Sequence, residues 1–243
     1  MPENTSILCL ETSGRIGSVA LAEGPILLGQ NNFSAPMRHS SEIFPAICQL
    51  LKQFGKTSSD IQQIYVSAGP GSFTGLRIAS TIAKIMNLAS NTKVVAIDTL
   101  DIIASNIEEF TEQKAEIDKI AVILDAKRSK FFIAGYEKEH INENFGGNSK
   151  NKAENWHKIT DDLLITATEF HKEFQTDKAA IALLGEGLLY YKNAFSAEKV
   201  IFLDEKCWEP QAKNVHKLGY QKALLGQFEN PVTLSPIYLR QPV

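Results

Sequence analysis

The sequence predicts an α/β protein built from two related lobes, and three observations support this class. Short apolar runs typical of strands alternate with segments whose apolar residues recur at helical spacing. An apolar run followed by an acid and a small turn occurs once in each half, as Leu10-Glu11-Thr12 and Leu124-Asp125-Ala126. The length of 243 residues fits one large domain or two small lobes. We expect lobes over residues 1–110 and 111–243, with allowance for the last helix to pack back on the first lobe.

Composition excludes several classes of protein. Hydrophobic residues make up 44% of the chain and charged residues 22%, which is typical of a globular protein and not of a disordered or collagen-like one. The 25 basic and 28 acidic residues leave a net charge of −3, which argues against a broad basic face that binds nucleic acid unaided. Three widely spaced cysteines, no leader pattern and no apolar run of membrane-spanning length favour a reduced, cytoplasmic protein without a membrane partner.

The elements of the first lobe follow in order. Turn signals separate three short apolar runs, which predict a meander of strands over residues 7–10, 17–22 and 26–33. A helix begins near Ser40 and carries apolar residues at helical spacing, namely Ile43, Ile47, Leu50, Leu51 and Phe54. We then expect a strand ending near Val66, a glycine-rich turn over 69–75, a helix over 76–89, a strand over 94–97 and a helical stripe over 100–107.

The second lobe is expected to repeat this plan with shorter elements. Strands are predicted over 120–124 and 131–136, and residues 144–155 are polar enough to form an exposed loop. Thr166 and Glu169 fit a capping box that opens a helix ending near Phe174. A buried strand over 179–184, a helix over 215–228 and an extended piece over 236–240 complete the chain.

The segment Gly69-Pro70-Gly71-Ser72-Phe73-Thr74-Gly75 is the most distinctive motif. Glycines allow a tight turn between a strand and a helix, and the helix N-terminus favours an anion. No Lys-Ser or Lys-Thr follows the last glycine, so this is not a Walker A loop, and Thr74 replaces the third glycine of a dinucleotide fingerprint. A purely structural turn that fixes the helix against the sheet is the competing interpretation.

Two acids could face a nucleotide. Glu11 and Asp125 each end a predicted strand, and paired acids can hold a magnesium–nucleotide complex. Thr12 and Ser13 follow Glu11, while Gly185 and Gly187 would let a purine approach the backbone. Each feature could also be an ordinary turn.

Metal and nucleophile motifs are missing. His39 precedes Glu42, but position 43 is Ile43, so no second histidine follows at metal-ligand spacing. Gly71-Ser72-Phe73 lacks the nucleophile-elbow pattern. We therefore expect no metal site and no catalytic residue.

Both long helices of the first lobe are apolar over more surface than one sheet contact requires. Phe44, Cys48 and Leu51 add a second apolar line to the first helix, and polar residues of the glycine-loop helix fall on a narrow stripe. The surplus predicts either a partner subunit or burial under other parts of the same chain.

Five motifs in their order along the chain are similar to those of the TsaB (YeaZ) family. They are residues 7–13 (ILCLETS), 39–42 (HSSE), 69–78 (GPGSFTGLRI), 125–128 (DAKR) and 236–240 (PIYLR). The resemblance implies an actin-like ATPase (ASKHA) fold and a role in forming the threonylcarbamoyl group on adenosine 37 of tRNAs that read codons beginning with A. It implies a non-catalytic scaffold for the paralogue TsaD, with the ATPase TsaE joining the complex.

The resemblance also implies a partner surface on the two helices, which pack on TsaD or on a second copy when the chain is alone. The residues expected there are His39, Glu42, Ile43, Ile47, Leu50, Gly71, Phe73, Thr74, Arg77, Ile78, Ile82 and Ile85. Contact with tRNA would come mainly through the complex.

Departures from the family pattern weaken independent nucleotide binding. Glu11 replaces the usual aspartate, and Lys130 reverses the charge of a usual glutamate. We expect a vestigial nucleotide cleft at Glu11, Thr12, Ser13, Asp125, Gly185 and Gly187, with ATP or ADP bound only at the junction of the complex. The competing hypothesis is an independent actin-like ATPase or small-molecule kinase; a metalloprotease is disfavoured by the missing histidine pair.

Overall fold

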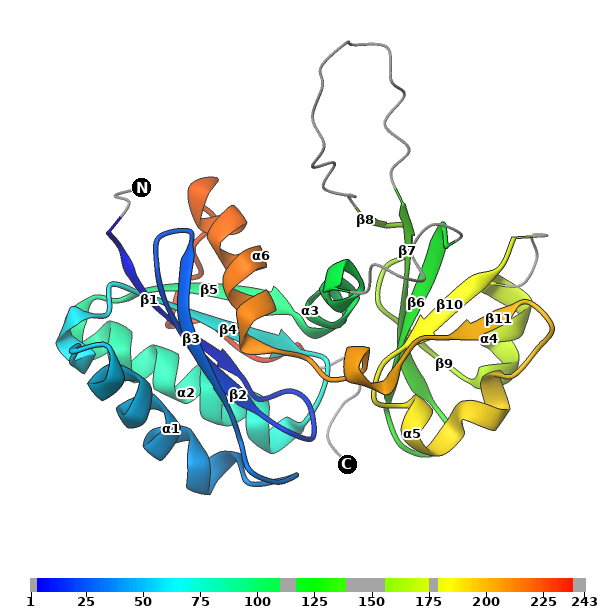
Figure 1. Cartoon of the computed structure of the whole chain (residues 1–243), viewed down its shortest axis with the longest axis horizontal. Coiled ribbons are helices and arrows are strands. Elements are labelled where there is room, and N and C mark those ends of the chain that lie inside the picture. The colour runs from blue at the N-terminus through cyan, green and yellow to red at the C-terminus, as the bar shows by residue number, and fades with distance from the viewer. Residues whose placement is uncertain (1–3, 110–116, 139–155, 175–178, 238–243) are drawn as a thin grey trace, which may run out of the picture. The chain divides into compact units, whose positions relative to one another are not determined.

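The computed structural model describes residues 4–109, 117–138, 156–174 and 179–237, and the chain divides into two compact units (Figure 1). Unit 1 comprises Met1–Ile103 and Glu209–Val243, and unit 2 comprises Ala104–Trp208. Glu209–Val243, which lies beyond the expected lobe boundary, belongs to unit 1, in line with the allowance for the last helix to pack back on the first lobe. The reason is that the last helix packs on the first sheet.

Unit 1 is built on a five-stranded mixed sheet of order β3-β2-β1-β4-β5. The strands are β1 (Ser6–Glu11), β2 (Ser18–Glu23), β3 (Ile26–Asn32), β4 (Gln63–Gly69) and β5 (Lys93–Asp98). The first three form the expected antiparallel meander, whereas β4 pairs parallel to β1 and β5 parallel to β4. Strand β4 is buried along its whole length, and Val94, Val95 and Ile97 of β5 are buried as well, as expected for strands covered on both faces.

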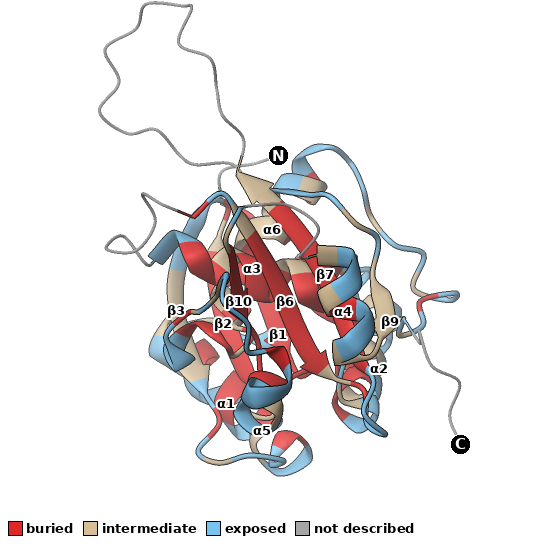
Figure 2. Cartoon of the chain, turned by 90° about the vertical axis from the view of Figure 1, so that its right-hand side faces the viewer, coloured by how far each residue is buried: buried red, intermediate tan, exposed pale blue. Residues whose placement is uncertain are grey.

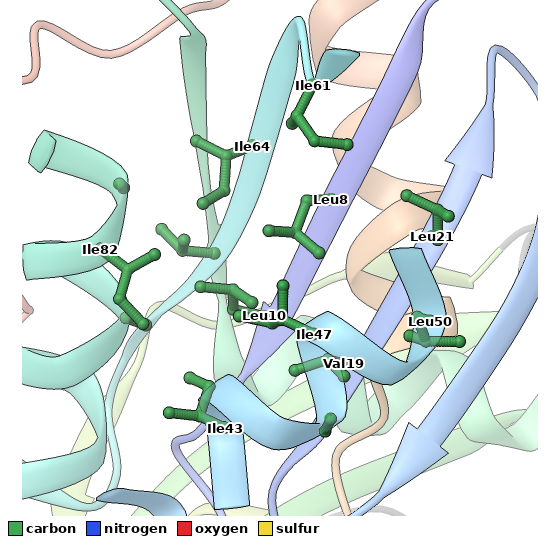
Figure 3. Packing of buried hydrophobic residues seen from close by; sticks show 14 of the residues in the cluster. Leu8, Leu10, Val19, Leu21, Ile43, Ile47, Leu50, Ile61, Ile64 and Ile82 are labelled. Carbon is green, nitrogen blue, oxygen red and sulfur yellow. The ribbon is translucent and has the colours of Figure 1, made fainter. Parts of the chain in front are cut away.

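Helices cover both faces of this sheet. Helices α1 (His39–Gln53) and α2 (Phe73–Ser90) lie on one face, where Leu8, Leu10 and Ile64 meet their inner residues (Figure 3). Helix α6 (Ala212–Leu224) packs on the opposite face against Ile7, Cys9 and other inward side chains of the sheet. The two helical layers explain why β1, β2 and β4 are buried, whereas the edge strand β3 is half-buried or exposed along its length.

Unit 1 is completed by short segments. The 3₁₀ turn η1 (Ser58–Asp60) precedes β4, and α3 (Thr99–Ala104) follows β5 and leads to η2 (Ser105–Glu109) at the start of unit 2. Helix α6 begins and ends a few residues before the expected 215–228. In the segment expected to be extended, Ile237 donates its N–H to Ala68 O at 2.7 Å, and 238–240 lie outside the described residues.

Unit 2 repeats the plan of unit 1. Its sheet has the order β11-β10-β6-β7-β8, with β9 also pairing to β7. The strands are β6 (Lys119–Asp125), β7 (Phe131–Lys138), β8 (Trp156–Lys158), β9 (Leu163–Ile165), β10 (Ile181–Leu184) and β11 (Val200–Phe202). Strand β6 pairs antiparallel to β7 and parallel to β10, as β1 does with β2 and β4. The weak sequence repeat therefore marks the ends of two equivalent strands.

Small helices and an aromatic cluster close unit 2. They are α4 (Ala167–Phe174), α5 (Leu188–Tyr191), η4 (Lys192–Phe195) and η5 (Glu205–Cys207). The Phe131 ring meets the Phe195 ring edge-to-face at 4.8 Å, and Phe195 meets Phe170 at 5.3 Å. Strands β6 and β7 are buried along most of their length (Figure 2). The loop expected over 144–155 lies outside the described residues.

None of the described helices has the length and hydropathy that crossing a membrane requires.

Candidate functional site

Glu11 ends β1 inside unit 1 and is fully buried. Its Oε1 accepts hydrogen bonds from Ser13 N–H at 2.6 Å, from Ser13 Oγ at 2.5 Å and from Gly14 N–H at 3.4 Å. Burial raises the pKa of Glu11, and the hydrogen bonds from Ser13 and Gly14 oppose this rise. The carboxyl group therefore organises its own turn, and part of its acceptor capacity is used there.

The glycine-rich turn closes directly over Thr12 and Ser13. Ser72 N–H donates to Ser13 O at 2.8 Å, and Thr12 Oγ1 donates to Gly75 O at 2.8 Å. Ser72 Oγ in turn accepts Gly75 N–H at 3.3 Å as the cap of α2. The two motifs that looked separate in the sequence thus form one structure that anchors the start of α2 to the end of β1.

Glycine is required where these segments meet. A Cβ on Gly75 would lie 1.8 Å from Thr12 O, and one on Gly71 would lie 2.5 Å from Ser13 O, with φ at +158° for Gly71. Both approaches are far below van der Waals contact. The close packing favours the structural interpretation of the glycines, and it leaves Thr12 and Ser13 buried against their own chain.

The expected nucleotide residues of unit 2 are also engaged within their unit. Asp125 Oδ1 accepts Lys127 N–H at 2.7 Å, and Asp125 Oδ2 accepts Lys127 Nζ at 2.7 Å. Gly185 has φ of +118°, and a Cβ there would lie 2.4 Å from Ile123 O. Gly187 N–H donates to the same Ile123 O at 3.0 Å, so both glycines serve the packing of the β10–α5 turn on β6. Glu11, Thr12 and Ser13 belong to unit 1, and Asp125, Gly185 and Gly187 belong to unit 2.

In the described part of the chain, no three His, Cys, Asp or Glu side chains lie close enough together to bind a metal ion. His39 is buried at the start of α1, with its ring edge-to-face on Phe33 at 5.8 Å. Burial lowers the pKa of His39. This histidine therefore serves the packing of unit 1 and is not presented to a partner.

Several residues expected at a partner surface face the core instead. Ile43, Ile47, Leu50 and Ile82 are buried between the helices and the sheet, as Figure 3 shows. Ile78 is partly buried and packs on the same cluster. These side chains fill the interior of unit 1, so a partner cannot contact them without rearrangement of the core, and the expectation for them is corrected.

A second set is exposed on the outer sides of the same helices. Gly71, Thr74 and Arg77 are exposed, Phe73 packs its ring 3.7 Å from the Arg77 guanidinium carbon, and Ile85 is 59% exposed. Glu42 is half-buried, because its carboxylate accepts from Ser34 N–H and Ser34 Oγ, both at 2.6 Å.

Two apolar residues of this surface were missing from the expected set. Phe44 is 57% exposed on α1, and Leu88 is 88% exposed near the end of α2. The second apolar line through Phe44 and Cys48 was the available signal for α1, whereas nothing in the periodicity singles out Leu88. We call the exposed residues Phe44, Cys48, Phe73, Arg77, Ile85 and Leu88 the outer helix face.

Comparison with known proteins gives a consistent result. Residues 34–229 match the family model described as TsaD, tRNA N6-adenosine threonylcarbamoyltransferase. The tRNA threonylcarbamoyladenosine biosynthesis protein TsaB of Haemophilus influenzae is 24% identical over 99% of this chain and 96% of its own length. The protein of the same name from Escherichia coli is 22% identical over 98% of this chain and 95% of its own length.

Solved structures agree on the fold. The structure of YeaZ from Pseudomonas aeruginosa superposes with a TM-score of 0.77 at 23% identity, covering 97% of this chain and all of its own. A structure described as an uncharacterized protein with similarity to peptidase YeaZ, from the same organism, gives 0.78 at 23% identity and the same coverage. The α/β class with two related lobes is thereby confirmed.

Proposed function

The chain belongs to the family described as TsaD, tRNA N6-adenosine threonylcarbamoyltransferase, and within it to the TsaB (YeaZ) group; from this premise we propose that it serves threonylcarbamoyladenosine formation in tRNA as a non-catalytic partner subunit. Its partners in this proposal are TsaD and TsaE, or a second copy of itself when it is alone. Nucleotide would bind at the junction of the complex.

The outer helix face is the observation that carries this proposal. Exposed Phe44, Ile85 and Leu88 lie on two neighbouring helices whose opposite sides already fill the core. Large apolar side chains exposed on two neighbouring helices favour a protein interface, and aromatic and arginine side chains such as Phe73 and Arg77 are enriched in interfaces. The helices therefore have one side for the sheet and one side available to a partner.

The interior of unit 1 supports the non-catalytic part. Position 43 holds Ile43, which is fully buried, and His39 packs on Phe33. An isoleucine side chain has no atom that can bind a metal, so His39 has no partner ligand one turn further along α1. The Oε1 atom of Glu11 is engaged in the turn that holds α2.

We expect Phe44→Asp and Ile85→Asp each to weaken association with TsaD strongly, because a charge placed in an apolar interface must be desolvated without a partner. A central interface residue contributes about 2 kcal/mol or more, so each variant should weaken the affinity at least thirtyfold. The measurement is titration with purified TsaD, followed by threonylcarbamoyladenosine formation on a tRNA transcript.

Leu225→Asp is the matched control, since Leu225 is an exposed leucine of the same unit outside the outer helix face. It should leave association and tRNA modification unchanged. Asp at Ala79 or Ile82 is unsuitable, because both face the core and the change would unfold the chain. Unchanged TsaD affinity in both outer-face variants would contradict the proposal.

An independent ATPase or kinase is the second candidate. It is favoured by the acids Glu11 and Asp125, which end the topologically equivalent strands β1 and β6. Calorimetric titration of the isolated chain with Mg-ATP separates the two functions. Micromolar binding with turnover would support the ATPase, whereas the partner-subunit proposal expects neither.

A further inference from the structure

The turn between β6 and β7 has an unusual backbone. Lys127, Arg128 and Ser129 have φ of 65°, 55° and 57°, so three consecutive residues other than glycine adopt the left-handed conformation. This conformation is unfavourable for L-residues and rarely occurs in succession. Strained backbone of this kind clusters at functional sites, so the turn invites a functional explanation. We call Lys127, Arg128 and Lys130 the basic turn.

Local hydrogen bonds hold the basic turn and leave two of its charges unpaired. Asp125 binds both the N–H and the Nζ of Lys127, and Ala126 N–H donates to Lys130 O at 2.9 Å. Asp125 therefore neutralises Lys127. Arg128 and Lys130 are exposed and form no ion pair with a described residue, although Lys130 interacts electrostatically with the carboxylate of Glu169. The turn therefore presents two positive charges to solvent, and Arg128 is the less compensated of the two.

Helix α5 places an aromatic side chain beside this turn. The Tyr191 ring meets the Phe131 ring edge-to-face at 5.1 Å, and Phe131 directly follows Lys130. Tyr190 immediately precedes Tyr191 in α5, which places it next to this ring contact. The hydrogen bond with Asp125 raises the pKa of Lys127, and the phenol groups of Tyr191 and Tyr190 contribute to this rise. Tyr190 itself is 67% exposed.

We propose that the basic turn and Tyr190 form a contact site for single-stranded RNA. Unpaired bases stack on exposed aromatic rings, and Lys and Arg side chains neutralise the adjacent phosphates. The site lies wholly in unit 2, whereas the outer helix face lies wholly in unit 1. The choice of RNA over another polyanion rests on the proposed function in tRNA modification and on the exposed ring, which an acidic peptide would not use.

Two positive charges, one of them partly offset by Glu169, predict weak binding, which agrees with the net charge of −3 of the whole chain. The site would thus add affinity and orientation to a tRNA that other subunits also bind. The proposed RNA contact also assigns a function to this turn, in which the carboxylate of Asp125 is already paired with Lys127.

The test is fluorescence anisotropy of the full chain with a labelled, unstructured 15-nucleotide RNA at low salt, with protein up to 500 μM. Arg128→Ala/Lys130→Ala should weaken binding about tenfold and reduce the slope of log affinity against log salt by about 1.4, from two phosphate contacts on a single strand. Tyr190→Ala should weaken binding about fivefold or more, and Tyr190→Phe should retain it. A blunt RNA duplex of the same length should bind more weakly than the single strand and should not respond to Tyr190→Ala.

Lys199→Ala/Lys206→Ala is the matched control, because it removes two exposed lysines of the same unit outside the basic turn. It should bind RNA as the wild type does. No binding by the wild type at 500 μM, or equal weakening by the control, would overturn the site. Displacement of RNA by polyglutamate together with unchanged binding of Tyr190→Ala would overturn it in favour of an acidic protein partner. Direct binding is measured without TsaD, so failure of the RNA site and failure of the partner-subunit proposal give different results.

Discussion

At the scale of single residues, Glu11 shows how a side chain can be mistaken for a nucleotide-binding residue when only its position in the sequence is known. Its place after an apolar strand suggests an acid that points at a nucleotide. In the structure, its Oε1 accepts three hydrogen bonds from the two residues Ser13 and Gly14. The carboxyl group is inside unit 1, and its protonation is therefore coupled to stability.

Replacement of Glu11 by glutamine should change how the free energy of unfolding depends on pH. Burial raises the pKa of Glu11 above its ordinary value near 4.5, so above that pH the folded state holds this proton more tightly than the unfolded state. Its contribution to stability is therefore complete below about pH 4.5 and is lost as the pH rises through the folded pKa. Glutamine keeps an acceptor oxygen and does not titrate.

Urea unfolding of both proteins between pH 4.5 and 8 measures this effect. The stability of Glu11→Gln relative to the wild type should increase with pH across this window, whatever the constant difference between the two. A difference that does not vary with pH would show that Glu11 titrates normally.

At the scale of elements, the contact between β1 and α2 depends on Gly75. Gly75→Ala should lower the free energy of unfolding by about 3 kcal/mol or more, because the added Cβ would collide with Thr12 O and push α2 away from its hydrogen bond with Thr12 Oγ1. Thermal and urea unfolding measure the loss.

Gly55→Ala provides the comparison for this substitution. No atom lies within 4 Å of a Cβ at Gly55, and its φ of +64° alone should cost about 1 kcal/mol. Equal destabilisation by the two substitutions would show that a small shift accommodates the added Cβ at Gly75. The close approach of Gly75 to Thr12 would then not be needed to hold β1 and α2 together.

Sequence patterns predicted the long elements well and the short ones poorly. The strands of unit 1 and helices α1 and α2 were expected within a few residues of their bounds, because each has enough apolar residues to show its period. Strands β8 and β9 were missed, since each has only three residues and pairs only with β7. The parallel order of β1, β4 and β5 depends on contacts distant in the sequence, which no local period contains.

The candidate surfaces show a similar limit. Ile82 is buried and Ile85 is mostly exposed, although both are isoleucines one helical turn apart. Periodicity reports that a helix is apolar on two sides, but only the packed sheet shows which side is inside. For the same reason the exposure of Leu88 emerges only from the structure, whereas Phe44 belongs to the second apolar line of α1 that the sequence shows.

At the scale of the whole molecule, unit 2 is one continuous segment inserted into unit 1. Its two ends are joined, because Asn106 Nδ2 donates to Cys207 O at 2.8 Å. It also has its own sheet and an aromatic cluster of Phe131, Phe170 and Phe195.

We therefore expect a fragment of residues 104–208 to fold alone and unfold in a single cooperative transition. The measurement is near-ultraviolet circular dichroism during heating, with a ¹H–¹⁵N correlation spectrum to test for dispersed signals. The comparison is a fragment of residues 1–103, which lacks α6 and should not give a dispersed spectrum. A fragment of 104–208 with collapsed amide signals would contradict the independence of unit 2.

The return of α6 to the first sheet has a consequence for synthesis. One face of that sheet, with Ile7, Cys9 and Tyr65, is covered by residues that are translated more than a hundred positions later. During synthesis, the apolar face of the first sheet therefore stays uncovered until residues 212–224 leave the ribosome. The inserted unit 2 can fold before that point. Unit 2 can then finish folding before unit 1, although the synthesis of unit 1 begins first. Residues 1–103 are therefore the part of the nascent chain most exposed to aggregation and most in need of a chaperone.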